Sequence, residues 1–261
     1  MSSALSQSGA TSRAALMEAL RRRLARIEEL GDDARGCLPF GLSALDSHLP
    51  RGGLAFGAVH EIAPASEADL PAAFAFLLSL LARMPGPAPL LLVLASRKLA
   101  RCGRPYGHGL NALGLDPARL ILVETADETE ALWATEEAMR ARGPGAVAAV
   151  LGGRIDLRTG QRLLHAARDG RLPLLLLRSE GGGVPTAATR WRIAARPGAR
   201  DRFGLLSSWR WHAALERCRN GQPGDWVLEF DHATHRFGLA AAVAGAPLAG
   251  SGAAAAGAHA D

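Results

Sequence analysis

The chain has 261 residues, 48% of them hydrophobic and 21% charged, which suits one large folded domain and excludes a mostly disordered chain. Its formal net charge is +5, and because Lys98 is the only lysine, arginine carries almost all of the positive charge. Arginine pairs with phosphates and stacks on bases, so this charge permits contact with nucleic acid. A general use of arginine in place of lysine explains it without any such contact.

The cysteines and the apolar segments bear on metal binding and on compartment. Cys37, Cys102 and Cys218 lie far apart and form no Cys-x-x-Cys pair, so we predict no zinc site, no redox motif and no other metal or cofactor. The N-terminal segment lacks the features of a signal peptide, and the longest apolar stretch, residues 72–82, is too short to span a bilayer. The sequence therefore predicts a cytoplasmic protein that does not enter the membrane.

The N-terminal region is predicted to hold one amphipathic helix over residues 11–30, which ends at Gly31. Apolar side chains recur at helical spacing along one face of this helix, and arginines occupy its other faces. The apolar positions are Leu16, Leu20, Leu24 and Ile27. Such a face docks on a partner or packs back on its own domain, and the sequence leaves both readings open.

Apolar strands alternate with helices through the middle of the chain. The predicted strands are residues 58–62, 90–95, 120–123, 146–151 and 174–177. The predicted helices are residues 67–84, 105–114, 127–142 and 159–169, with Asp127 as an N-cap and Asp156 as a loop or N-cap residue. Continuous apolar strands between helices are typical of a mostly parallel sheet covered on both faces, so the predicted fold class is α/β.

Nearer the C-terminus the pattern changes to alternation with a period of two. Residues 190–195, 208–219 and 225–230 show it, and Asn220-Gly221 is a typical hairpin turn between the last two. We predict that these three segments extend the sheet as antiparallel strands. Trp209 and Trp211 share one face of the second segment. Burial is the default for tryptophan, but if this face is exposed it is the best candidate for a partner interface.

A run with three glycines, residues 52–57, precedes the first strand and reads like the approach to a phosphate-binding loop. The strand at 58–62 follows and contains the acidic Glu61. A phosphate-binding loop continues with glycines and a Lys-Ser/Thr pair at a helix start. This chain instead continues with the seven residues from Ala63 to Asp69, which contain neither glycine nor lysine.

In order and spacing, these segments resemble the core of the RecA-type ATPases and, more narrowly, the ImuA family of RecA-like proteins. The matching segments are residues 41–62, 113–142, 208–221 and 226–230. The resemblance implies a RecA-like core over residues 36–240, of the P-loop NTPase type with an antiparallel C-terminal extension. An N-terminal tail and helix (1–35) would precede this core, and a disordered Ala/Gly-rich tail (241–261) would follow it.

Membership of that family implies a bacterial, damage-inducible role in DNA repair, as part of the SOS response. ImuA-like proteins act with an ImuB-like protein, which resembles a polymerase but lacks its activity, and with an error-prone DNA polymerase. Together they perform mutagenic translesion synthesis. We therefore expect these two proteins as partners, with the ImuA-like member as an adaptor. RecA is a further candidate partner, onto which helix 11–30 would dock in an alternative role as a regulator.

The resemblance also indicates where ATP chemistry would lie and where its residues are missing. Pro64 removes a backbone donor, and Glu67 and Asp69 complement a helix dipole but would repel a phosphate. Ser66 is expected to be a turn or capping hydroxyl rather than a metal ligand. The strand at 146–151 ends without a metal-binding aspartate. We expect a degenerate site, no bound nucleotide and no enzymatic activity, with a residual DNA-dependent ATPase as the alternative.

Basic side chains near the predicted loops are candidates for contact with DNA or a partner. The densest cluster follows the strand at 90–95 and lies beside Tyr106, a combination that can bind single-stranded DNA by phosphate pairing and base stacking. Contact with an acidic partner and simple solvation are the other readings. The basic candidates are Arg97, Lys98, Arg101, Arg104, Arg154 and Arg158.

Overall fold

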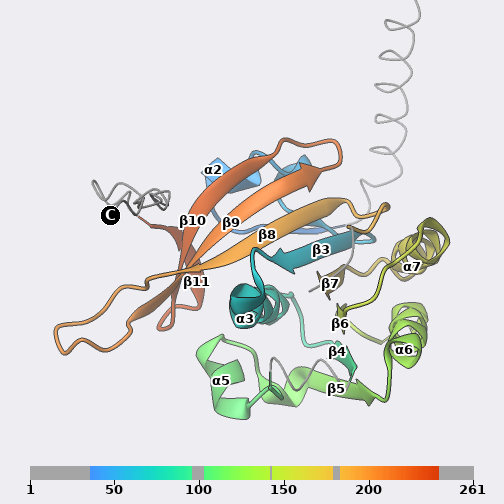
Figure 1. The fold of residues 1–261 in the computed structure, drawn as a ribbon, viewed down its shortest axis with the longest axis horizontal. Coiled ribbons are helices and arrows are strands. Elements are labelled where there is room, and N and C mark those ends of the chain that lie inside the picture. The colour runs from blue at the N-terminus through green and yellow to red at the C-terminus, as the bar shows by residue number, and fades with distance from the viewer. Residues whose placement is uncertain (1–35, 96–102, 142, 179–182, 241–261) are drawn as a thin grey trace, which may run out of the picture.

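The main sheet has nine strands within the part of the chain that the computed structural model describes, which is residues 36–95, 103–141, 143–178 and 183–240. Their order across the sheet is β11-β10-β9-β8-β3-β7-β6-β4-β5 (Figure 1). The strands are β3 (Val59–Pro64), β4 (Leu90–Ala95), β5 (Leu120–Thr125), β6 (Ala146–Leu151), β7 (Leu174–Arg178), β8 (Thr189–Arg196), β9 (Ser208–Cys218), β10 (Gly224–Asp231) and β11 (Arg236–Leu239).

Six neighbouring strands, from β8 through β3, β7, β6 and β4 to β5, run parallel. Every residue of β3, β6 and β7 is buried, because helices cover both faces of this part of the sheet. The helices α3 (Leu70–Ala82) and α5 (Gly107–Ala112) pack on one face, and α6 (Glu128–Arg140) and α7 (Leu157–Gly170) pack on the other (Figure 1). The α/β class with a mostly parallel sheet is thereby confirmed.

The antiparallel part of the sheet begins one strand later than the sequence predicted. The segment predicted at 190–195 is β8, which pairs parallel with β3 and antiparallel with β9. Only β9, β10 and β11 are antiparallel to every neighbour. The prediction failed for β8 because a period of two reports that one face of a strand is covered, whereas it carries no information on strand direction.

Helix boundaries differ from the predictions by a few residues. The segment predicted as one helix over 67–84 divides into a 3-10 turn, η2 (Glu67–Asp69), and α3. The predicted helix at 105–114 is the shorter α5, and α7 starts two residues before the predicted 159. Asp127 and Asp156 cap α6 and α7 by accepting hydrogen bonds from backbone N–H groups of the first turn, as predicted for Asp127 and as one reading of Asp156.

Several short elements lie ahead of β3, and one more follows α5. Strands β1 and β2 form a separate two-stranded antiparallel sheet ahead of β3. These elements are β1 (Cys37–Leu38), α2 (Ser43–Asp46), η1 (Pro50–Gly52), β2 (Leu54–Ala55) and, after α5, η3 (Pro117–Arg119).

An aromatic cluster joins the antiparallel strands to α3. Five buried rings, those of Phe40, Phe76, Trp191, Trp211 and Phe237, have neighbouring centroids 5.3 to 6.3 Å apart. Large aromatic side chains bury much apolar area and gain further from tilted and edge-to-face contacts. The cluster therefore makes the C-terminal strands part of the same core as α3 rather than an appendage.

No helix within the described ranges is both long and apolar enough to cross a membrane.

Candidate functional site

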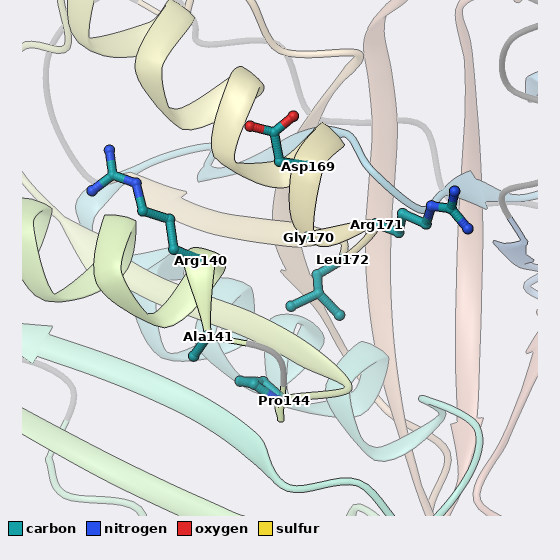
Figure 2. A pocket seen from close by; sticks show the side chains of 7 residues that line it. All are labelled: Arg140, Ala141, Pro144, Asp169, Gly170, Arg171 and Leu172. Carbon is teal, nitrogen blue, oxygen red and sulfur yellow. The ribbon is translucent and has the colours of Figure 1, made fainter.

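The two edges of the parallel strands differ in what they offer a ligand. A cavity of about 580 Å³ lies between the ends of α6 and α7, just before β6 and β7 begin (Figure 2). Its lining residues are Arg140, Ala141, Pro144, Asp169, Gly170, Arg171 and Leu172. Open α/β sheets bind ligands beyond the carboxyl ends of their strands, so this cavity lies at the opposite edge from the expected nucleotide site.

The segment between β3 and α3 lies at the carboxyl edge, where a RecA-like ATPase would hold its phosphates. Ser66 and Asp69 form a reciprocal capping box at the start of η2. The Ser66 hydroxyl donates to Asp69 Oδ2 at 2.7 Å, and the Ser66 N–H donates to the same oxygen at 3.1 Å. Ser66 is thus a capping hydroxyl, as the sequence predicted.

The second oxygen of Asp69 is also engaged. The backbone N–H of Ala195, near the end of β8, donates to Asp69 Oδ1 at 2.8 Å. These hydrogen bonds, with the Ser66 hydroxyl making the largest contribution, lower the pKa of the Asp69 carboxyl from its ordinary value. An ionised carboxylate therefore lies at the helix start that would face a phosphate, and it ties that start to β8.

Pro64 is buried at the end of β3, and its carbonyl accepts a hydrogen bond from Arg192 Nη1 at 3.2 Å. Arg192 also forms a bidentate ion pair with Glu216, with N–O distances of 2.9 and 3.1 Å. Glu67 is exposed on η2. Arg192 on β8, paired with Glu216 on β9, thus holds the end of β3 in place.

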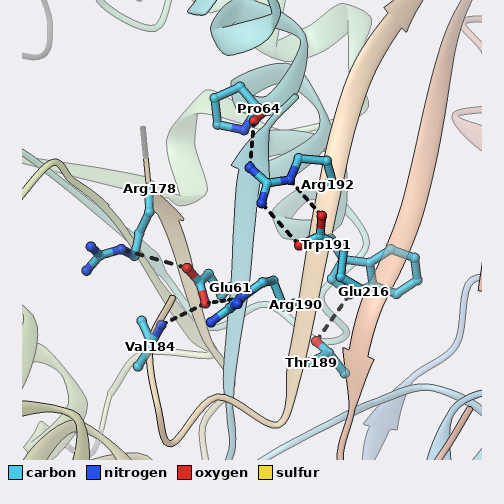
Figure 3. A network of polar contacts seen from close by, with 9 residues as sticks. All are labelled: Glu61, Pro64, Arg178, Val184, Thr189, Arg190, Trp191, Arg192 and Glu216. Carbon is cyan, nitrogen blue, oxygen red and sulfur yellow. Dashed lines mark hydrogen bonds and ion pairs between the residues drawn. The ribbon is translucent and has the colours of Figure 1, made fainter. Parts of the chain in front are cut away.

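Glu61 lies at the centre of a buried charge network (Figure 3). Its Oε2 accepts hydrogen bonds from Arg190 Nε and from the backbone N–H of Val184, each at 2.9 Å. Arg178 Nε lies 3.8 Å from Glu61 Oε1, and both side chains are almost fully buried. Burial lowers the pKa of Arg178 from its ordinary value, and the Glu61 carboxylate opposes that shift. The carboxylate joins β3, β7 and β8.

The sequence placed Glu61 in the first strand but did not predict the network around it. Arg178 ends β7 with its side chain inside the protein, which the sequence did not predict either. An arginine at the end of an apolar strand and an acidic residue inside a neighbouring strand are the signal that would have suggested the pair, because buried charges are found paired.

A second carboxylate occupies the carboxyl end of β6. The backbone N–H of Gly152 donates to Glu128 Oε1 at 2.8 Å, and that of Gly153 donates to Glu128 Oε2. A Cβ at Gly153 would lie 2.6 Å from this oxygen, so a larger residue there would displace the end of the Glu128 side chain. Sequence reasoning missed the contact, although an acidic first-turn residue on α6 and two glycines after a strand are its local signals.

Three of the basic candidates lie within the described residues. Arg104 forms an ion pair with Glu124 on β5, and Arg154 and Arg158 are exposed after β6 and on α7. The other candidates, Arg97, Lys98 and Arg101, lie outside the described residues, as do the four apolar positions of the predicted N-terminal helix. Contact of any of them with DNA or a partner stays a prediction.

Trp209 and Trp211 belong to the core side of β9. Trp211 is 2% exposed, and Trp209 is half-buried at the margin of the same cluster, with its ring edge-on to His232. The exposed face on which a partner contact would depend is therefore absent at Trp211. Among the residues described, no group of three or more His, Cys, Asp or Glu side chains is placed to hold a metal ion.

Comparison with known proteins gives the family. No protein-family model matches the chain. The chain is 35% identical over 233 residues to Protein ImuA of Caulobacter vibrioides strain NA1000, an alignment that covers 79% of this chain and 90% of that protein. It belongs to the ImuA family. The Protein ImuA of a second strain, ATCC 19089, gives the same figures. The sheet of this ImuA family member is compatible with a RecA-like core.

Proposed function

We propose that this ImuA family protein is a non-catalytic adaptor in damage-induced, error-prone translesion DNA synthesis. Its partners would be an ImuB-like protein and an error-prone DNA polymerase, and it would work without binding ATP. The observation that carries the proposal is the Asp69 carboxylate, which sits at the start of the helix after β3 with both oxygens hydrogen-bonded to the protein.

An ATPase of this fold needs a helix start that is open to a phosphate and lined by backbone N–H groups. Here Asp69 accepts the hydrogen bond of the Ser66 N–H and also brings its own negative charge. A phosphate at this point would meet the repulsion of a fixed anion and would have to replace bonds already made. The geometry therefore supports a helix start that complements its own dipole.

Two further contacts support the same proposal. Glu61 points into the buried network with Arg178 and Arg190, so its carboxylate is committed to joining strands. Glu128 accepts hydrogen bonds from the backbone N–H groups of Gly152 and Gly153 at the end of β6. Both carboxylates are thus used for contacts within the chain, which supports a protein that holds neither metal nor nucleotide here.

The adaptor role is tested by binding to the purified ImuB-like protein of the same bacterium, with and without ATP and Mg²⁺. We expect a complex whose Kd is the same in both conditions, because no nucleotide takes part. A tenfold or greater change of Kd on adding ATP, or hydrolysis of ATP that single-stranded DNA stimulates, would contradict the proposal and favour the residual ATPase.

A further inference from the structure

The connection between β8 and β9, residues 197–207, forms an arm that projects beyond the sheet (Figure 1). Every residue from 200 to 207 is exposed, and three of them are large and apolar. Phe203 is 71% exposed, Leu205 66% and Leu206 48%. Surface turns are normally built from Gly, Pro, Asn, Asp and Ser, so three large apolar side chains at the end of an arm need a reason other than turn formation.

Internal hydrogen bonds hold the end of the arm in one shape. The Asp201 carboxylate accepts hydrogen bonds from the N–H groups of Phe203 and Leu205, at 2.8 and 2.9 Å. The Arg200 guanidinium donates to the carbonyl of Gly204 at 2.6 Å, and Gly204 has a φ of +78° that favours glycine. The turn is therefore formed before any partner arrives, which lowers the entropy that binding costs.

We propose that the arm tip, defined as Arg200 to Leu206, is a docking element for a partner protein. Phe203 and Leu205 would enter an apolar pocket, and the arginines of the arm would meet an acidic rim around it. The arm carries Arg200 and Arg202, and Arg196 lies just before it, against the single carboxylate of Asp201, so its charge is complementary to acidic side chains. A central apolar anchor with charged side chains around it is the common anatomy of a protein interface.

The contacts of the tip favour a protein over a nucleic acid. Leucine has no aromatic face on which a base can stack, and two of the three exposed apolar side chains are leucines. The Arg202 guanidinium lies 4.7 Å from the centroid of the Phe203 ring and covers that face.

A second copy of this chain offers a less suitable pocket for the arm tip. The cavity between α6 and α7 is lined by Arg140 and Arg171 with the single carboxylate of Asp169. This surface would repel the arginines of the arm. Charge complementarity therefore favours a different protein as the partner of the arm tip. Because this inference rests on the proposed adaptor function, the ImuB-like protein is the partner used to test it.

The test compares the full-length wild-type chain with a double variant, Phe203→Ser and Leu205→Ser. Val227→Ser is the matched control, because Val227 is also exposed and apolar but lies on β10. We expect at least a tenfold higher Kd for the ImuB-like protein in the double variant and an unchanged Kd in the control. The melting temperatures of the wild-type chain and the double variant should agree, since the substituted side chains are exposed.

Each other outcome overturns the inference in a distinguishable way. If the wild type and the double variant bind the ImuB-like protein equally well, the arm is not the docking element, while the adaptor function stands. If the wild type itself does not bind the ImuB-like protein, both the adaptor function and this inference are wrong. Loss of binding to labelled single-stranded DNA, with protein binding intact, would assign the tip to nucleic acid. A change in oligomeric state on gel filtration would assign it to a second copy.

Discussion

His60 shows how much one side chain depends on the tertiary fold. It is fully buried on β3, where its Nδ1 lies 2.8 Å from Thr189 Oγ1 and its Nε2 lies 2.9 Å from the carbonyl of Ala55. The carbonyl can only accept, so Nε2 carries the proton and Nδ1 accepts from the Thr189 hydroxyl. That hydroxyl in turn accepts from Trp191 Nε1 at 3.1 Å. The neutral ring is thus fixed in one tautomer.

This arrangement predicts a loss of stability in mild acid. Burial lowers the pKa of His60 from 6.5 to about 4. Between these two values the unfolded chain binds a proton and the folded chain does not, so stability is fully present above pH 6.5 and falls as the pH drops toward 4. A shift of this size corresponds to about 3 kcal/mol. Urea unfolding of the wild type and of a His60→Gln variant at pH 7 and pH 4.5 measures this loss of unfolding free energy. An equal pH dependence in both proteins would contradict the assignment.

At the scale of elements, the Glu61 network joins three neighbouring strands through one carboxylate. Glu61→Gln removes the carboxylate charge that faces the buried Arg178 and the partly buried Arg190, and breaking a buried pair in this way costs roughly 3 kcal/mol or more. Glu216→Gln is the matched control, because it breaks the exposed pair with Arg192, which is worth under about 1 kcal/mol. Urea unfolding at pH 7 compares the two free energies of unfolding. Equal losses would show that the Glu61 network does not hold the strands together.

The same elements show what the sequence could predict. Apolar runs such as Leu90–Ala95 identified the parallel strands, and Asp127 identified the start of α6, because these signals are local. The direction of β8 depends on its pairing with β3, which lies far away in the sequence. The contacts of Glu61 and of Glu128 likewise join distant segments. A single sequence gives the residue types in these sites but not the partners that the fold brings to them.

Across the molecule, two features bear on the proposed function. At the carboxyl edge of the parallel strands, the carboxylates of Asp69 and Glu128 accept hydrogen bonds from backbone N–H groups of the chain itself. The arm between β8 and β9 begins at this same edge, because β8 runs parallel to β3, and it carries exposed apolar side chains beyond the sheet (Figure 1). Both features support the adaptor function proposed above. Composition predicted one large domain, whereas only the structure placed the arm outside the core.

We propose that this chain has no working nucleotide site, and calorimetric titration with ATP in the presence of Mg²⁺ tests this proposal. We expect no heat of binding at ATP concentrations up to about 1 mM, which corresponds to less than about 4 kcal/mol of binding free energy. Saturable, Mg²⁺-dependent binding of ATP with a Kd in the micromolar range would contradict it.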